Sequence, residues 1–142
     1  MKTFNTTGKC IPSLHYMVDI SRQVEAAAQL VRDGNYFCIN RGRQFGKTTT
    51  LSALKRKLDK EGYSVFSLSF EGLDDEVFSS LSRLLYVSMY MMQSCVEWGN
   101  VHNLPKESAT VLRDFKDSDS GELSSMKYSK LISTLCMTSR VV

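Results

Sequence analysis

Apolar residues recur along this chain in two patterns, and each pattern predicts a different kind of element. In five stretches they return every three or four residues, which indicates amphipathic helices. These helices are expected at residues 20–32, 47–60, 76–98, 109–115 and 122–137. Two other stretches are short. Residues 36–39 are almost all apolar, and residues 63–70 alternate in part between apolar and polar. Such runs predict strands, and the first is expected to be buried on both faces.

The order of these elements predicts a parallel sheet. A strand at 36–39, a helix at 47–60 and a strand at 63–70 follow one another within 40 residues. A strand, helix and strand so connected form a right-handed parallel crossover. The sequence therefore predicts an α/β class.

Local signals set the boundaries. Asp19 or Ser21 can cap the first helix, and Gly34 can end it in a left-handed conformation. The chain of 142 residues fits a single domain. We expect it to divide into an N-terminal segment at 1–18, a core at 19–75 and a mainly helical part at 76–142, with a mobile linker at about 100–121.

The stretch between the first strand and the second helix carries the chemistry. Residues 41–48 read Arg-Gly-Arg-Gln-Phe-Gly-Lys-Thr and so end in the Gly-Lys-Thr of a phosphate-binding P-loop. Glycine allows backbone N–H groups to approach phosphates closely, and the following helix adds its N-terminal N–H groups and dipole. Lys47 is expected on the β- and γ-phosphates, and the Thr48 hydroxyl on Mg²⁺. The residues expected to contact nucleotide are Gly42, Arg43, Gln44, Phe45, Gly46, Lys47, Thr48 and Thr49.

One position departs from the common motif. The pattern G-x-x-x-x-G-K-[ST] would place glycine at position 41, where this chain has Arg41. Gly42 can supply the flexibility one residue later. A chance Gly-Lys-Thr at a basic helix start is the alternative, and the predicted strand before it and helix after it favour the P-loop.

The segment at 15–19, His-Tyr-Met-Val-Asp, and the stretch at 40–48 resemble the bacterial AAA-ATPase-like proteins, which are related to archaeal-type and STAND ATPases. That family commonly carries Arg-Pro-Arg-Arg-Phe-Gly-Lys-[Ser/Thr], so Arg41 is normal for it, whereas Gly42 and Gln44 depart from it. The resemblance covers residues 14–76 well. It implies a three-layer α/β/α P-loop domain with a parallel sheet, ATP with Mg²⁺ as ligand, and Tyr16 near the adenine or ribose; Tyr16 as a core residue is the alternative.

The family continues into a Walker B strand that ends in Asp-Glu, where the acids hold Mg²⁺ and activate water. No such strand follows residue 76. We therefore expect the chain to be the N-terminal part of an ATPase, with the fold incomplete, and the two final valines at 141–142 to begin the next strand. The acidic turn at 71–76 can be interpreted as a Walker B acid, or as caps and N-terminal charge for the next helix.

Two other functions compete with ATP binding by an ATPase. A small P-loop kinase would use Glu71 or Asp74 as its catalytic acid, but it should have an Arg-rich lid, and only Arg113 and Arg140 follow Arg83. A non-catalytic interaction fragment would use the Met- and Tyr-rich residues 84–92 to bind a protein partner. Those residues are also typical of core packing.

Composition bears on nucleic-acid binding and on the cellular compartment. The net charge of +3 gives little indication of nucleic acid, and the basic residues 55–57 fit a solvated helix C-terminus. Four cysteines at 10, 38, 95 and 136 lack zinc or disulfide spacing, which indicates a reducing compartment. No signal peptide and no apolar run of about 18 residues is present, so a cytoplasmic protein is expected.

Overall fold

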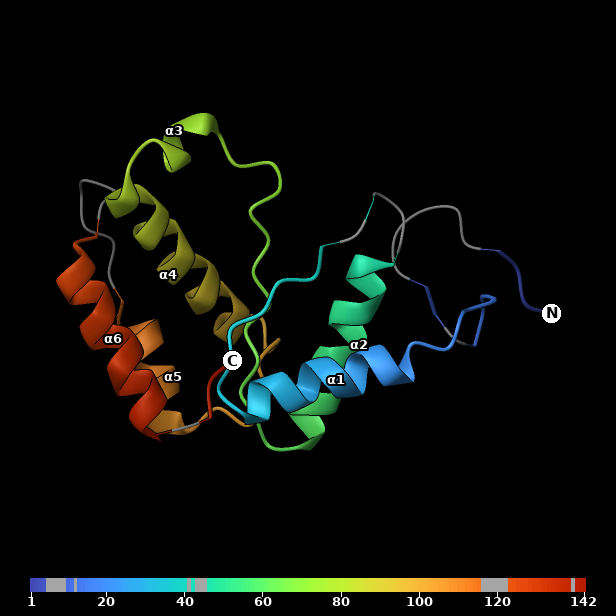
Figure 1. Cartoon of the computed structure of the whole chain (residues 1–142). Coiled ribbons are helices and arrows are strands. Elements are labelled where there is room, and N and C mark those ends of the chain that lie inside the picture. The colour runs from blue at the N-terminus through green and yellow to red at the C-terminus, as the bar shows by residue number, and fades with distance from the viewer. Residues whose placement is uncertain (5–9, 12, 41, 43–45, 116–122, 139) are drawn as a thin grey trace. The chain divides into compact units, whose positions relative to one another are not determined.

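The computed structural model describes the chain outside a few short gaps. The described residues are 1–4, 10–11, 13–40, 42, 46–115, 123–138 and 140–142. They form two compact units, Met1–Glu61 and Gly62–Val142. Figure 1 shows the six helices of the described residues, α1 to α6 in chain order.

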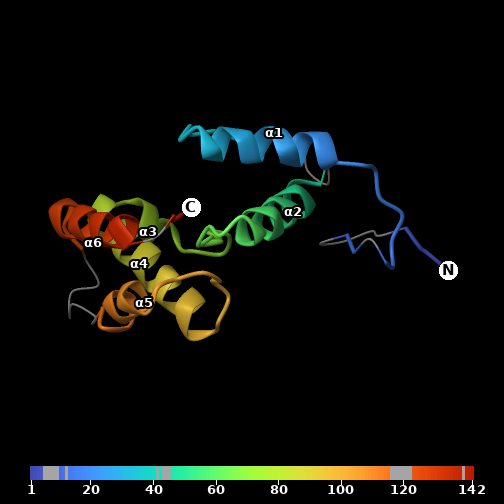
Figure 2. The ribbon, with the colours of Figure 1, turned by 90° about the horizontal axis from the view of Figure 1, so that it is seen from below.

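Two helices make up most of the first unit. α1 (Ser21–Arg32) and α2 (Lys47–Lys60) pack against each other, as the second view also shows (Figure 2). α1 buries Val24, Ala27 and Ala28, whose spacing places them on one face. α2 buries Leu54 and Leu58, also one turn apart. The small alanines allow close approach of the two backbones, and the contact follows the apolar periodicity of the sequence.

The C-terminal boundary signal of α1 agrees with the structure, whereas the expected cap at Asp19 or Ser21 does not: the N-cap residue is Ile20, which makes no side-chain cap hydrogen bond. The side chain of Asp19 accepts a hydrogen bond from the backbone N–H of Ser21 at 2.9 Å, next to the start of α1. Gly34 ends α1 with a φ of +70°, a conformation that favours glycine. The helices predicted at 20–32 and 47–60 are therefore confirmed.

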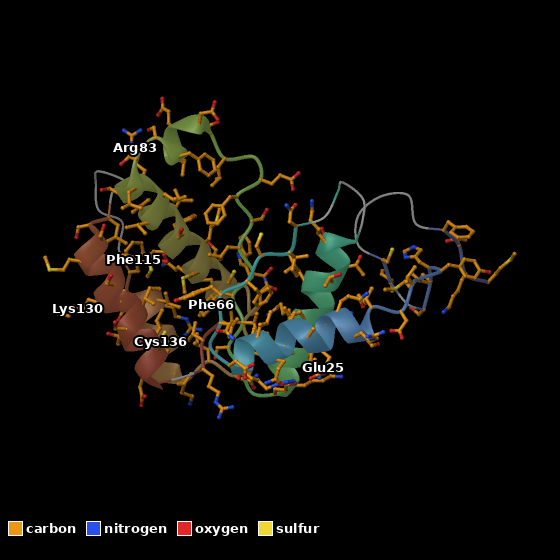
Figure 3. All side chains as sticks on the ribbon, viewed as in Figure 1. Glu25, Phe66, Arg83, Phe115, Lys130 and Cys136 are labelled. Carbon is orange, nitrogen blue, oxygen red and sulfur yellow. The ribbon has the colours of Figure 1, made fainter. Side chains whose placement is uncertain are left out.

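The second unit is a small helical core. It contains α3 (Asp75–Phe78), α4 (Leu81–Glu97), α5 (Lys106–Arg113) and α6 (Ser125–Thr138), and α4, α5 and α6 pack on one another. The buried cluster consists of Met89, Met92, Val96, Ala109, Leu112, Phe115, Leu123 and Leu135. Figure 3 shows Phe115 beside this helical group. Because Met89 and Met92 are buried, these two methionines of the Met- and Tyr-rich helix serve core packing.

One predicted helix is split in two. The stretch expected at 76–98 is interrupted between α3 and α4, where Ser80 is extended with φ −136° and ψ 127°. The Ser79 hydroxyl donates to the carbonyl of Glu76 at 2.7 Å. Serine side chains compete in this way for backbone groups, which explains the break.

The predicted α/β fold with a parallel sheet is wrong. Among the described residues no strand is present, and only two isolated parallel bridges occur, between Thr3 and His15 and between Ser64 and Val141. The segment at 36–39 is not buried on both faces either, since Tyr36 and Cys38 are exposed. An apolar run becomes a strand only when a neighbour completes a ladder of hydrogen bonds, and none does so here.

The bridge to Val141 shows how close the second segment comes to a strand. The N–H of Ser64 donates to the carbonyl of Arg140 at 2.8 Å, and the N–H of Val142 donates to the carbonyl of Ser64 at 3.0 Å. The N–H of Phe66 donates to the carbonyl of Val142 at 2.8 Å. Phe66 and Val141 pack against the helical cluster, so this extended segment serves as a cover for helices (Figure 3).

Candidate functional site

Gly46, the residue directly before α2, has a left-handed backbone conformation. Gly46 precedes the helix with φ 75° and ψ 21°, in the left-handed region that favours glycine. The ladder of α2 begins with the N–H of Thr50 donating to the Gly46 carbonyl at 2.9 Å. The N-cap residue, Gly46, has no side chain to make a cap hydrogen bond, and the first turn of α2 contains no acidic residue. The N–H groups of the first turn therefore have no intrahelical acceptor and carry the positive end of the dipole.

The side chains of this turn differ in exposure. Lys47 and Thr48 are exposed, whereas Thr49 and Thr50 are buried. The Thr49 hydroxyl accepts a hydrogen bond from the backbone N–H of Cys10 at 3.3 Å. Thr48 is therefore the hydroxyl of the motif that solvent and a metal ion can reach. Thr49 can donate its backbone N–H to a ligand, while its hydroxyl accepts the hydrogen bond from Cys10 of the N-terminal segment.

The other predicted contacts are only partly described. Gly42 is exposed. Arg41, Arg43, Gln44 and Phe45 lie outside the described residues. The structure thus brings Gly46, Lys47, Thr48 and Thr49 together at one helix end.

Tyr16 does not lie in a core. Its side chain is 54% exposed, and its ring lies beside that of Phe4, with 5.0 Å between the centroids. Neither Phe4 nor the Cys10–Thr49 hydrogen bond was predicted. Both belong to a polar, aperiodic stretch, and no spacing signal in the sequence could have found them.

The acidic turn serves a helix. Asp74 is the N-cap residue of α3, and Asp75 and Glu76 occupy its first turn, where negative charge is favourable. Glu76 also pairs with Arg83 at 3.4 Å. Within the described ranges, no three His, Cys, Asp or Glu side chains gather to hold a metal ion. The structure thus favours the interpretation of this turn as helix charge.

The basic run on α2 is largely paired with acids. Lys55 lies 3.5 Å from Asp59, and Lys57 lies 2.8 Å from Glu25 of α1 and 3.3 Å from Glu61. Arg32 joins the same network by pairing with Glu25. Glu25 is labelled where α1 meets this network in Figure 3. The pairing favours a solvated, ion-paired helix face.

This network predicts a pH-dependent contribution to the stability of the α1–α2 contact. The hydrogen bond from Lys57 lowers the pKa of Glu25 below its ordinary 4.5, and the hydrogen bond to Glu25 raises the pKa of Lys57 above 10.5. The stabilisation from a carboxyl whose pKa is lowered by folding, here Glu25, is present above pH 4.5. It is lost as the pH falls through the lower pKa of the folded state. The stabilisation from an ammonium group whose pKa is raised by folding, here Lys57, is present below pH 10.5. It is lost as the pH rises through the higher pKa of the folded state. Both contributions therefore operate between these values.

We expect Glu25→Gln to lower the melting temperature of α1–α2 by roughly 2 °C at pH 7, because exposed ion pairs contribute little individually. The difference should shrink as the pH falls below 4.5, and also in 1 M salt. Circular dichroism melts across pH measure it. Glu71→Gln, at an exposed turn, is the matched control and should change little. A deficit that persists unchanged at pH 2.5 would show that Glu25 acts through packing instead.

Two further findings concern membrane-spanning helices and similarity to known proteins. In the part of the chain that the structure describes, no helix has both the length and the apolar character needed to span a membrane. The chain matches no protein-family model, no curated protein and no solved structure.

Proposed function

We propose that this chain binds a nucleoside triphosphate, ATP together with Mg²⁺, through residues 41–48 and the first turn of α2. One observation carries the proposal: a left-handed Gly46 directly precedes exposed Lys47 and Thr48 at the N-terminus of a helix. Such an end attracts anions through its N–H groups and dipole. Lysine adds a full positive charge for the terminal phosphates.

Mg²⁺ is expected to arrive with the phosphates. This ion keeps several waters and takes few protein ligands in nucleotide sites. The exposed Thr48 hydroxyl fits such a single contact. The choice of ATP over GTP rests on the resemblance to AAA-ATPase-like proteins.

The setting proposed for this activity is the cytoplasm, where Mg-ATP is abundant and cysteines stay reduced. The scattered cysteines support it, since they lack the spacing of a disulfide framework. A protein partner belongs to the same proposal. Exposed Tyr90, Trp98 and Met126 offer apolar surface for such a contact.

Thermal melting with saturating Mg-ATP tests the proposal. At a ligand concentration 100 times the dissociation constant, binding should stabilise the chain by about 2.7 kcal/mol, which raises the melting temperature by several degrees. Mg-AMP, which lacks the β- and γ-phosphates, is the control and should have little effect. A cooperative melt that Mg-ATP leaves unchanged, with no heat in titration calorimetry, would refute the proposal.

A further inference from the structure

Helix α4 is apolar on two faces. One face contains Met89 and Met92, which are buried in the core of the second unit. On the other side of the helix, a second row of residues recurs with spacings of three and four, and we call it the outer row: Leu84, Val87, Met91, Ser94 and Trp98. At 100° per residue, the outer row lies roughly 150° from the core face. A helix of a globular domain normally has one apolar face, so the second one indicates a further contact.

The outer row is separate from that core. Among the described residues, none of its apolar members belongs to the buried cluster or to the side chains packed against it. Three of them are half-buried, and Trp98 is 76% exposed. The Ser94 hydroxyl donates to the carbonyl of Tyr90 at 3.0 Å, so it can enter an apolar contact without leaving its donor unpaired. Spacings of three and four residues suit packing against another helix.

Charged residues flank the outer row in a symmetrical pattern. Arg83, Tyr90 and Glu97 follow one another at intervals of seven residues and so lie in line beside it. Figure 3 labels Arg83 near the start of α4; its side chain is 43% exposed, and Tyr90 and Glu97 are exposed too. Two antiparallel copies of α4 that meet at Tyr90 place Arg83 of each copy beside Glu97 of the other. Parallel copies place like charges at the same level instead, so the charges favour the antiparallel pair.

The contacts that these two charged groups make within the chain leave this pairing possible. Arg83 pairs with Glu76 at 3.4 Å, and the side chain of Glu76 is 86% exposed. Glu97 accepts a hydrogen bond from the side-chain amide of Gln93 at 3.3 Å. A guanidinium has five N–H donors and a carboxylate can accept several hydrogen bonds. Each group can therefore take a second partner.

We propose that α4 pairs with α4 of a second copy of this chain, antiparallel, through the outer row and with an Arg83–Glu97 ion pair at each end. The inference names the protein partner of the proposed function and does not depend on nucleotide binding. The two copies are related by a two-fold axis beside Tyr90, so the same patch of each copy meets the other. One pair of helices forms an interface at the small end of the usual range, so we expect a weak dimer with a dissociation constant of about 10–100 µM.

Charge exchange in the full chain tests the pairing and its direction. Sedimentation velocity without nucleotide, at roughly 1–500 µM protein, spans the expected dissociation constant. Arg83→Glu and Glu97→Arg should each weaken dimerisation about tenfold, because each turns two attractions into two repulsions. The double variant restores both attractions with the charges exchanged, so it should dimerise like the wild type. Neither substitution should unfold α4, since an acid near a helix N-terminus and a base near its C-terminus are favourable.

Lys130→Glu is the matched control. It makes the same change of charge at an exposed position of α6 in the same unit (Figure 3) and should dimerise like the wild type. Equal weakening in this variant would mean that net charge, rather than the Arg83–Glu97 pair, controls association, and would overturn the proposal.

The remaining outcomes also decide between support and rejection. Weaker association of both single variants, with recovery in the double variant, supports the antiparallel pair. A wild type that stays monomeric at all these concentrations overturns it, and so does a dimer that the single variants leave unchanged. Weakening without recovery in the double variant overturns it as well, because the two charges then do not face each other. Since no nucleotide is present, none of these results bears on ATP binding, which the melts with Mg-ATP test separately.

Discussion

Lys47→Ala should reduce the stabilisation by Mg-ATP from about 2.7 kcal/mol to about 0.4–1.4 kcal/mol and leave the unliganded chain at least as stable as the wild type. Hydrogen bonds between charged groups contribute about 1.5–3 kcal/mol, so affinity should fall about tenfold to a hundredfold. Without ligand, the substitution is expected to stabilise the chain instead of destabilising it. A cation at a helix N-terminus opposes the dipole, and its removal should favour folding by about 0.3–1 kcal/mol. Paired melts with and without Mg-ATP measure both effects.

Lys60→Ala is the matched control for this prediction. Lys60 is exposed and occupies the other end of α2. Lys60→Ala therefore removes the same charge from the same helix. Its loss should leave the shift with Mg-ATP intact, and should slightly destabilise the unliganded chain, because cations are favourable at a helix C-terminus. Equal loss of the ATP effect in both variants would mean that general positive charge, rather than Lys47 in the motif, attracts the nucleotide.

The helices could be predicted because their signals are local. In α1, Val24, Ala27 and Ala28 follow the helical period, and Gly34 provides the left-handed end. α2 runs from Lys47 to Lys60 as the pattern indicated. Each of these features depends on residues within a few turns of one another, so the sequence alone contains the necessary information.

The sheet could not be predicted in the same way. An apolar run such as 63–70 indicates an extended, partly buried segment, and the structure agrees with that much. A strand also needs a neighbour in register, and pairing is non-local. Here the described residues offer this segment a single bridge, to Val141. The order of elements suggested a parallel crossover, but order does not supply the hydrogen-bond partners.

The candidate site shows the same division. Gly46, Lys47 and Thr48 could be picked out because the motif is contiguous and starts a helix. The hydrogen bond from Cys10 to Thr49 joins residues 39 positions apart, and the contact between Phe4 and Tyr16 depends on a bridge near the N-terminus. Such contacts depend on tertiary structure, and only coordinates reveal them.

The largest effect on stability is expected from Leu135→Ala. Leu135 of α6 is completely buried in the cluster that also contains Met89 of α4 and Leu112 of α5. Truncation removes buried apolar surface and leaves a cavity between three helices, at a cost of about 2–5 kcal/mol. Total stabilities of about 5–15 kcal/mol are typical of domains, so this is a large fraction. The melting temperature of the second unit should fall by about 8 °C or more.

Hydrogen exchange localises that effect, and an exposed leucine controls for it. Amides of α4, α5 and α6 should lose protection together in Leu135→Ala, because the three helices share one cluster. Leu81→Ala makes the same chemical change in the same unit, but Leu81 is 62% exposed and its truncation should alter stability by less than about 0.5 kcal/mol. If both leucines had equally small effects, the side chain of Leu135 would not be packed between these helices, and the shared core would be refuted. If only α6 lost protection, α4 and α5 would be held together without it, by the other buried residues of the cluster.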